Sequence, residues 1–349
     1  MKRLLLVVVL IAMSACLLAQ ITPYGSARVG YWLENWDEDR TGYGESDLRS
    51  NYLLQSNSRF GVDFKQEGFD AKVEFGAAPS LRLLWARQSF GNWSLLVGQE
   101  EVIPNQKTNQ VYNSDGNLIG WGAVDGGRRT QIKFAMDNGL YAALIQPNMV
   151  NPAGAPGTAE FLIPMVNVGF NYRRDAISLA PTFVFQTFEY DEYKNGGREG
   201  SVMSWLGAVT FDYNANPILV RASFNYGSNT GNMGYTGPNN FAGWKVERDE
   251  DDNITNEETV DTATLGGWLT FQYNISPIFN MTAGFGYAAS SNDDWDNDDD
   301  RMAIYLQAQY RAGRLRIIPE IGLMDEMNNT RGDSQGSIMY FGTQLRLDF

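Results

Sequence analysis

A two-residue alternation of apolar and polar side chains runs through this sequence and continues to its last residue. At the C-terminus the apolar set is Phe349, Leu347, Leu345, Thr343, Phe341 and Met339, with mostly polar residues between them. Side chains that alternate with period two belong to a strand with two different faces, not to a helix. After residue 19, no segment approaches the roughly 18 consecutive apolar residues of a membrane-spanning helix. The pattern therefore predicts an all-β protein.

Alternating segments come in pairs that flank very short turns. Each turn carries the Gly, Pro, Asn or Asp that tight connections favour. The paired segments are 57–65 with 70–76, 81–90 with 93–99, 128–136 with 141–146, 166–173 with 176–185, 205–214 with 218–226, 266–274 with 279–287, and 302–311 with 314–323. A first segment at 24–34 and the C-terminal segment bring the number of predicted strands to sixteen.

Short turns alternate along the chain with connections that are mostly longer and polar. This arrangement is typical of an antiparallel transmembrane β-barrel with short periplasmic turns and long external loops, and it favours a place in the bacterial outer membrane. Aromatic residues gather near strand ends, as Phe271 and Tyr273 do, which fits an interfacial girdle and not a soluble β-sandwich. Pro181 and Pro319 fall within predicted strands, where each removes a ladder donor. We expect a bulge or a protein-covered face at each proline.

The first nineteen residues have the form of a secretory signal peptide. Lys2 and Arg3 precede an apolar run that ends near residue 18 and is too short for a comfortable membrane helix. We expect cleavage after Ala19, which leaves a barrel domain at 20–349 without cysteine and changes the formal charge from −14 to −16. The alternative is a lipoprotein signal in which Cys16 is lipidated.

The C-terminal Phe349 is predicted to lie at the lipid-facing end of a closing strand. That strand would pair with the first one, so that the barrel has no open edge. A final aromatic preceded by apolar residues at alternate positions also resembles the signal by which bacterial outer-membrane barrels are recognised for assembly. We therefore assign Phe349 as the assembly signal.

The alternation also predicts which charged side chains face the lumen. Sixteen strands leave room for an aqueous channel. On the predicted inward face basic residues outnumber acidic ones, although the whole chain is acidic. Arg82 and Arg87 have opposite parity in one segment, which leaves the register of that segment open. The basic residues assigned to the lumen and its constriction are Arg28, Arg59, Arg128, Arg129, Lys133, Arg221, Arg316 and Arg346.

The long connection 100–127 is predicted to fold into the barrel and narrow the bore. It is glycine-rich and contains Trp121, and long ordered loops tend to be functional. Opposed charges across a narrow bore order water and favour dipolar or charged solutes. An ordinary external loop is the alternative. The charged residues of the connection, expected to face Arg128, Arg129 and Lys133 on the wall, are Glu100, Glu101, Lys107, Asp115 and Asp125.

Two other connections, 247–258 and 292–301, hold most of the acidic residues. Such runs are usually solvated surface. The alternating carboxylates of Asp294, Asp296 and Asp298 could supply oxygen ligands to calcium, although the glycine and glutamate of an EF-hand loop are missing. A surface calcium site is therefore a weak candidate, and no other cofactor is expected.

The mature chain resembles the sixteen-stranded general bacterial porins in its opening segment 24–32, in "SRFGVDF" and in its terminal aromatic. More narrowly, 87–99 and 127–148 resemble DcaP-type porins, and Arg128 and Arg129 are the arginines that match. This resemblance implies a trimer in outer-membrane lipid that favours small anionic solutes such as dicarboxylates.

Other classes of function are disfavoured by composition. The chain contains no histidine, which excludes Ser–His and His–Asp catalysis, so no enzyme is expected. A strongly acidic chain repels nucleic-acid phosphates. The tripeptide within 330–334, "TRGDS", matches an integrin-recognition motif, so a surface adhesin is the alternative from another class. We predict a homotrimeric porin for passive diffusion of small hydrophilic solutes and ions, with a weak preference for anions, or else a substrate-selective channel.

Overall fold

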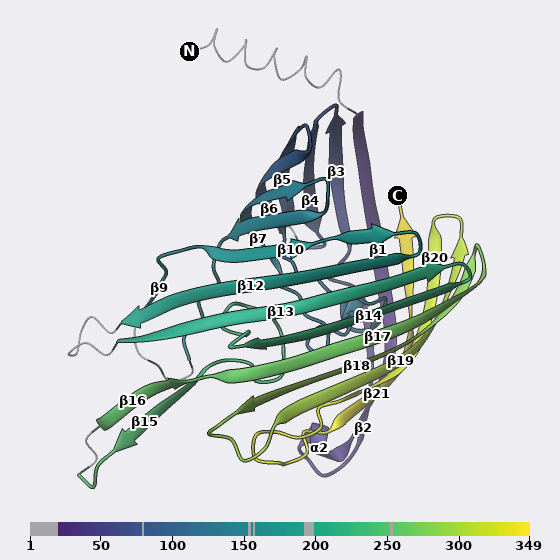
Figure 1. The fold of residues 1–349 in the computed structure, drawn as a ribbon. Coiled ribbons are helices and arrows are strands. Elements are labelled where there is room, and N and C mark those ends of the chain that lie inside the picture. Colours follow the sequence, from purple (N-terminus) through teal and green to yellow (C-terminus); the bar gives the residue numbers. More distant parts are fainter. Residues whose placement is uncertain (1–19, 79, 153–154, 156–157, 192–198, 252–253) are drawn as a thin grey trace, which may run out of the picture.

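The protein is a closed antiparallel barrel of sixteen strands in the computed structural model (Figure 1). The structure describes the residues from 20 onward except 79, 153–154, 156–157, 192–198 and 252–253. The predicted signal peptide, with Cys16, lies outside these residues. Within the described part of the chain, no helix is both long and apolar enough to cross a membrane. The predicted fold class and strand number are confirmed.

Two of the barrel strands are each divided into two elements, β2 with β3 and β10 with β11. The short strand β9 (Thr158–Glu160) pairs with the end of β12 and belongs to the same sheet, whereas β15 (Gly243–Arg248) and β16 (Ile254–Val260) form a separate two-stranded sheet. Two short helices are α2 (Glu38–Thr41) and α3 (Tyr112–Asp115). The elements of the wall are β1 (Gln20–Trp36), β2 (Asp47–Leu54), β3 (Arg59–Gln66), β4 (Phe69–Gly76), β5 (Leu81–Phe90), β6 (Trp93–Glu101), β7 (Arg128–Met136), β8 (Leu140–Ile145), β10 (Met165–Phe170), β11 (Tyr172–Arg174), β12 (Ile177–Asp191), β13 (Glu199–Ala215), β14 (Ile218–Ser228), β17 (Thr262–Ser276), β18 (Phe279–Asn292), β19 (Asp299–Ala312), β20 (Leu315–Asp325) and β21 (Ser337–Asp348).

The barrel closes between its first and last strands. β1 pairs with β21 over eleven residue pairs from Ser26↔Asp348 to Trp36↔Ile338. The ladder continues to the last residue, because Gly25 N donates to Phe349 O at 2.8 Å and Phe349 N donates to Gly25 O at 3.0 Å. The seven predicted hairpins all form, and their short turns lie at the same end of the barrel as Gln20 and Phe349.

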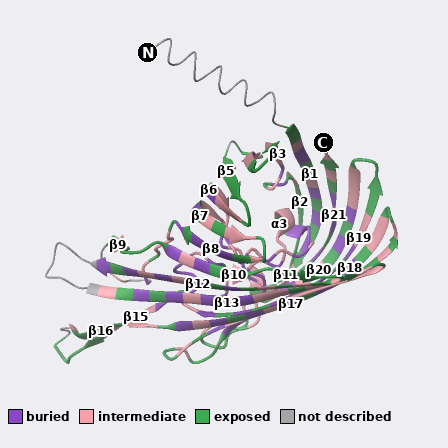
Figure 2. Cartoon of the chain, turned by 45° about the horizontal axis from the view of Figure 1, so that its top comes forward, coloured by how far each residue is buried: buried purple, intermediate pink, exposed green. Residues whose placement is uncertain are grey.

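Burial alternates along the strands, as Figure 2 shows by its change between purple and green. The outward residues are apolar and exposed, for example Phe341 and Phe285, because lipid rather than protein covers them. Several inward aromatic rings lie over glycines of the neighbouring strand. A Cβ at Gly284 or Gly322 would overlap the ring of Tyr305 or Tyr340. Because glycine has no side chain, each ring can lie flat against the backbone of the neighbouring strand.

Each proline within a strand lies where one of its two ladders is interrupted. Pro181 pairs with Val209 of β13, and on its other side it faces the break between β10 and β11. Pro319 pairs with Thr343 of β21, while the β19–β20 ladder omits the pairs between Gln307 and Tyr310. The missing N–H of proline therefore removes no hydrogen bond that the ladder would otherwise make.

The wall is low beside β2. Within the described residues, β2 pairs only with β1, and β4 and β5 end before they reach its free edge. β2 is level with residues 29–36 of β1, whose neighbours on β21 include the lipid-facing Phe341 and Met339. The free edge therefore lies at the height of the apolar belt, where unpaired backbone groups are costly.

On the opposite side of the barrel the wall is tall. β12 and β13 extend far beyond the belt, and the β15–β16 hairpin projects beside them (Figure 1). Part of the acidic connection 247–258 is therefore a β-hairpin and not an irregular loop.

Candidate pore constriction

Four arginines lie in register on the inner wall, one on each of four neighbouring strands. Arg311 pairs with Arg316, Arg316 with Arg346, and Arg346 with Arg28, across β19, β20, β21 and β1. Cβ atoms of opposite residues are about 4.5–5.5 Å apart, and like charges there repel. Asp348 relieves part of this repulsion, since its carboxylate lies 2.7 Å from Arg346 Nε and 2.9 Å from Arg316 Nε. The row keeps an excess of positive charge.

Three of these arginines, Arg28, Arg316 and Arg346, line a lumen cavity of about 390 Å³, here called the arginine cavity. Among its described lining residues, the acidic ones are Asp115 and Asp125. A second cavity of about 480 Å³, which reaches Phe349, shares three arginines with the first. The lumen is therefore electropositive on this side, whereas the chain as a whole is acidic. The basic residues that line the first cavity are Arg28, Arg59, Arg82, Lys107, Arg128, Arg316 and Arg346.

A β-bulge settles the register that the sequence left open. The β4–β5 ladder shifts by one residue between Glu74 and Phe75, and such a shift reverses the face to which later side chains point. Before the shift, Arg87 pairs with Asp70 at 2.5 Å. After it, Arg82 Nε donates to Glu74 at 2.6 Å. Both arginines therefore face the lumen.

The segment 102–127 lies inside the ring of strands, where Figure 2 labels α3. Its backbone is held by the inner-wall residue Glu320, which is 1% exposed. Val111 N donates to one carboxyl oxygen at 2.8 Å and Tyr112 N to the other at 3.0 Å. Tyr340 Oη donates at 2.9 Å and Gln307 Nε2 at 2.9 Å. One wall carboxyl group thus receives four donors, two of them from the loop.

Apolar contacts hold the same segment against the wall. Tyr112 stacks on Tyr340 with ring centroids 3.8 Å apart, and Trp32 packs edge-on against both rings. Burial, and then the nearby Glu34 carboxylate, raise the pKa of the Tyr112 hydroxyl above its usual value. Leu118 is fully buried in the same cluster. The apolar residues at this end of the loop therefore belong to a buried core inside the barrel. A freely moving external loop would make no such contacts.

A second segment, 229–242, also folds inward, and the sequence did not predict it. Met233 and Tyr235 pack with Val102 and Val124 of the first segment and with wall residues of β8 to β13. Tyr235 Oη donates to Ile103 O at 3.0 Å. This part of the lumen is therefore filled by packed apolar side chains. The signal available in the sequence was composition, because 229–242 is rich in Asn and Gly and contains no charged residue.

Arg129 is covered by this second segment and does not line the arginine cavity. Its Nη2 donates to Met233 O at 2.8 Å, and the residue is half-buried. Lys133 and Glu100 lie nearby on the inner wall, 3.9 Å apart, and are also absent from the described cavity lining. Lys133 therefore meets Glu100 of the neighbouring strand and Arg129 meets the segment 229–242, whereas Lys107, Asp115 and Asp125 of the loop line the arginine cavity.

Glu101 is the last residue of β6 and therefore belongs to the wall, whereas Lys107 belongs to the loop and lines the arginine cavity. Glu101 lies 2.7 Å from Lys107 Nζ and 3.4 Å from Arg128 Nη2. Arg221 Nη1 donates to Lys107 O at 3.1 Å while its Nε donates to Asp212 at 2.9 Å.

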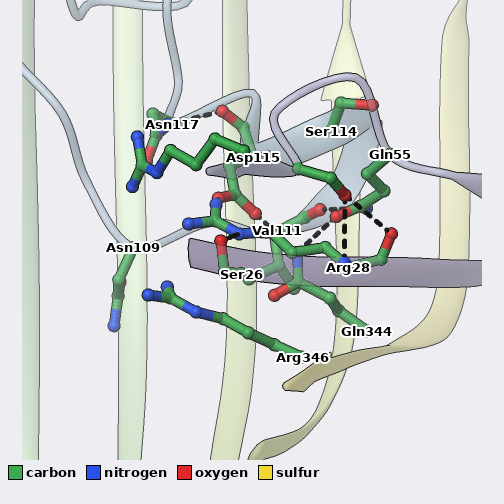
Figure 3. A network of polar contacts seen from close by, with 12 residues as sticks. Ser26, Arg28, Gln55, Asn109, Val111, Ser114, Asp115, Asn117, Gln344 and Arg346 are labelled. Carbon is green, nitrogen blue, oxygen red and sulfur yellow. Dashed lines mark hydrogen bonds and ion pairs between the residues drawn. The ribbon is translucent and has the colours of Figure 1, made fainter. Parts of the chain in front are cut away.

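Asp115 makes the closest contact between the loop and the arginine row (Figure 3). One carboxylate oxygen forms an ion pair with Arg28 Nη1, and the other accepts from Gln344 Nε2 at 2.6 Å. Gln344 also donates to Gln55, whose Nε2 donates to Val111 O at 3.1 Å. The three wall residues that surround the carboxylate are almost fully buried.

The external acidic residues do not form a metal site in the part of the chain that the structure describes. No group of three or more His, Cys, Asp and Glu residues is arranged there to hold an ion. Asp294 instead lies 3.3 Å from Lys245 Nζ, and neither Asp296 nor Asp298 joins such a group. The calcium candidate therefore gains no support.

A sixteen-stranded barrel with an apolar outer belt, short turns at one end and a loop folded into a charged lumen has the architecture of bacterial outer-membrane porins. This architecture fits a place in the outer membrane.

Solved structures show the same fold. DcaP of Acinetobacter baumannii matches with a TM-score of 0.68 and 15% identity over 95% of this chain and 97% of that one. OmpT of Vibrio cholerae matches with a TM-score of 0.61 and 14% identity over 95% and 98%. An anion-selective porin from Comamonas acidovorans matches with a TM-score of 0.60 and 13% identity over 95% and 100%. Comparisons with family models and with curated proteins give no match. The predicted resemblance to porins is confirmed at the level of the fold.

Proposed function

We propose that this protein is a passive, non-enzymatic outer-membrane channel for small hydrophilic solutes, and that it prefers anions. The observation that carries the proposal is the row of arginines in register from Arg311 to Arg28, three of which line the arginine cavity. A Comamonas protein of the same fold is described as an anion-selective porin. The adhesin alternative is weaker, because Arg331 of its motif pairs with Asp333 of the same motif at 3.2 Å.

The preference follows from where the charge lies. Permeating ions must pass the cavity, because the two inward segments fill much of the remaining lumen. Protein walls of low dielectric focus the field of the arginines into this narrow space. The acidic residues of the outer loops act through water and salt, which screen a charge beyond about 10 Å. The arginines therefore decide which ion crosses, and the loops change only the concentration at the mouth.

A planar bilayer that holds the refolded protein under a KCl gradient tests this proposal. We expect the sign of the reversal potential to show that chloride is more permeant than potassium. Raising the salt concentration on both sides at a constant ratio should reduce the preference, since screening weakens the field of the arginines. A potassium-selective potential would contradict the proposal, and the absence of conductance would contradict an open channel of any selectivity.

A substrate-selective channel is the second candidate. Guanidinium groups in a row are suited to carboxylate solutes, because each presents donors in a fixed fork. Dicarboxylates are the class implied by the DcaP resemblance. Saturation of the current by one such solute, with chloride current as the reference, separates selective from general permeation.

We further propose that the protein is a homotrimer in which β2 faces a neighbouring copy. The free edge of β2 lies at belt height, and its outward residues Tyr52 and Leu48 are 76% and 71% exposed. An open strand edge is not tolerated in hydrocarbon. A second copy would cover this edge with protein. Lipid chains cannot form hydrogen bonds with its unpaired backbone groups.

Replacing Tyr52 with lysine should convert most of the protein from trimer to monomer, because a charge would then be buried at the contact. Light scattering of the detergent-purified protein measures the mass directly. Phe224→Lys is the matched control, since Phe224 is also outward and 50% exposed but lies on β14, away from β2. Equal loss of trimer in both variants would point to damage to the barrel instead of to a contact at β2.

A further inference from the structure

We propose that Arg28 and Gln344 form a carboxylate-binding site in the permeation path, and that Asp115 of the loop occupies it until a permeant carboxylate takes its place. This proposal rests on the proposed channel function and adds a ligand class and a site to it. In Figure 3 the Asp115 side chain points from the loop to Arg28 and Gln344, as a bound carboxylate ligand would.

The wall side of this site is built in advance. Arg28 and Gln344 are 2% and 1% exposed, and their positions are fixed by neighbours on β1, β2 and β21. Arg28 Nε donates to Ser26 Oγ at 3.2 Å, which orients the guanidinium. Gln344 is held by Gln55, which is itself fully buried. The wall thus supplies Ser26 as a partner of Arg28 and Gln55 as a partner of Gln344, and Gln55 in turn donates to Val111 O of the loop.

Asp115 does not satisfy the site completely. Its two oxygens are divided between Arg28 Nη1 and Gln344 Nε2, and Arg28 Nη2 is buried without a hydrogen-bond partner. A free carboxylate is not attached to a backbone, so it can lie in the plane of the guanidinium and accept from both terminal nitrogens. A solute can thus make a contact that the loop residue does not make.

The loop backbone around Asp115 favours exchange. Non-glycine residues adopt left-handed conformations only at a cost, and such a stretch persists when its surroundings enforce it. Release of the Asp115 contact would let this stretch relax. The described residues with positive φ in this part of the loop are Asn113 at 49°, Ser114 at 61°, Asp115 at 57°, Asn117 at 55° and Leu118 at 58°.

The cavity gives a solute access to the pair. Arg28 and Asp115 both line the arginine cavity, and the Asp115 side chain is 17% exposed. Arg346, the cross-strand neighbour of Arg28, lines the same cavity and can hold an anion beside the occupied site. Exchange then needs only a short displacement of the Asp115 carboxylate from Arg28 to water in the cavity, and no covalent bond is made or broken.

Acetate is the probe, substituted for chloride at constant ionic strength in a planar bilayer. We expect the acetate concentration that half-saturates the current to fall at least tenfold in Asp115→Ala, because the internal competitor is gone. Asp63→Ala is the matched control, since Asp63 is also an inner-wall carboxylate but pairs with Lys72 at 3.1 Å and lines neither of the two described cavities. Its half-saturating concentration should stay within about twofold of the parent value. Equal shifts in both variants, or no shift in either, would overturn the site.

Arg28→Lys tests the site even if Asp115→Ala does not refold. Lysine keeps the charge but lacks the planar fork, so the half-saturating acetate concentration should rise at least fivefold while the KCl reversal potential stays the same. An unchanged acetate response would overturn the site and leave the anion-preferring channel intact. A KCl potential that is potassium-selective in the parent protein would instead refute the channel proposal, so the two failures are distinguishable.

Discussion

Glu320→Ala should release the 102–127 loop from the wall, raise the single-channel conductance several-fold and destabilise the barrel. The substitution removes the acceptor of two loop amides, Val111 N and Tyr112 N, and of two buried side-chain donors. Each buried donor left without a partner costs about 1–3 kcal/mol. Water can enter from the cavity and satisfy part of the set, so we expect a loss on the order of 3 kcal/mol in the free energy of unfolding. Single-channel recording and urea unfolding in detergent measure the two effects.

The control for this change is Asp63→Asn. Asp63 is also an inner-wall carboxylate, but it pairs with Lys72 at 3.1 Å and touches no loop residue among its described contacts. Its substitution should leave conductance unchanged and alter stability by less than about 1 kcal/mol. If Glu320→Ala keeps the parent conductance, the apolar contacts of Tyr112 and Leu118 alone suffice to hold the loop, and the carboxyl group is not its main anchor.

The barrel could be predicted from the sequence because each strand reports its own two faces. Alternation and short turns are local features of the sequence. Together with the chain length they specify sixteen strands with one pairing order. The prolines within strands also predict a local feature, because proline cannot donate to a ladder. One ladder is interrupted at Pro181 and one at Pro319. The low wall beside β2 was not predicted, because strand height depends on how neighbouring strands are staggered.

The lumen could be predicted only in part, for a physical reason. The parity of Arg28 and Arg346 along their strands is enough to place both on the inner wall, where the structure has them. Arg82 needed a bulge that no residue in its segment announces. The covering of Arg129 could not be predicted, because the segment that covers it lies about a hundred residues further along the chain. Contacts between two inward loops are tertiary, and neither loop encodes the other.

The arginine row should determine the sign of the selectivity. Replacing both Arg316 and Arg346 with glutamate changes the local charge by four units and leaves Asp348 without its two partners. Five basic and four acidic residues would then line the cavity, in place of seven and two, and the released Asp348 carboxylate beside it would cancel the remaining excess. We expect the reversal potential under a KCl gradient to change sign, with a change of at least tenfold in the chloride-to-potassium permeability ratio.

The matched control carries the same change in total charge at a place outside the cavity. Arg173→Glu with Arg174→Glu alters two exposed arginines of β11 beside a short turn, and neither lines the arginine cavity. Exposed charges there are screened by salt, so the permeability ratio should change by less than about twofold. A reversal of sign in both double variants would show that total charge, and not the arginine row, sets selectivity. Chloride selectivity that survives Arg316→Glu with Arg346→Glu would assign the selectivity to the other arginines of the cavity lining, Arg59, Arg82 and Arg128.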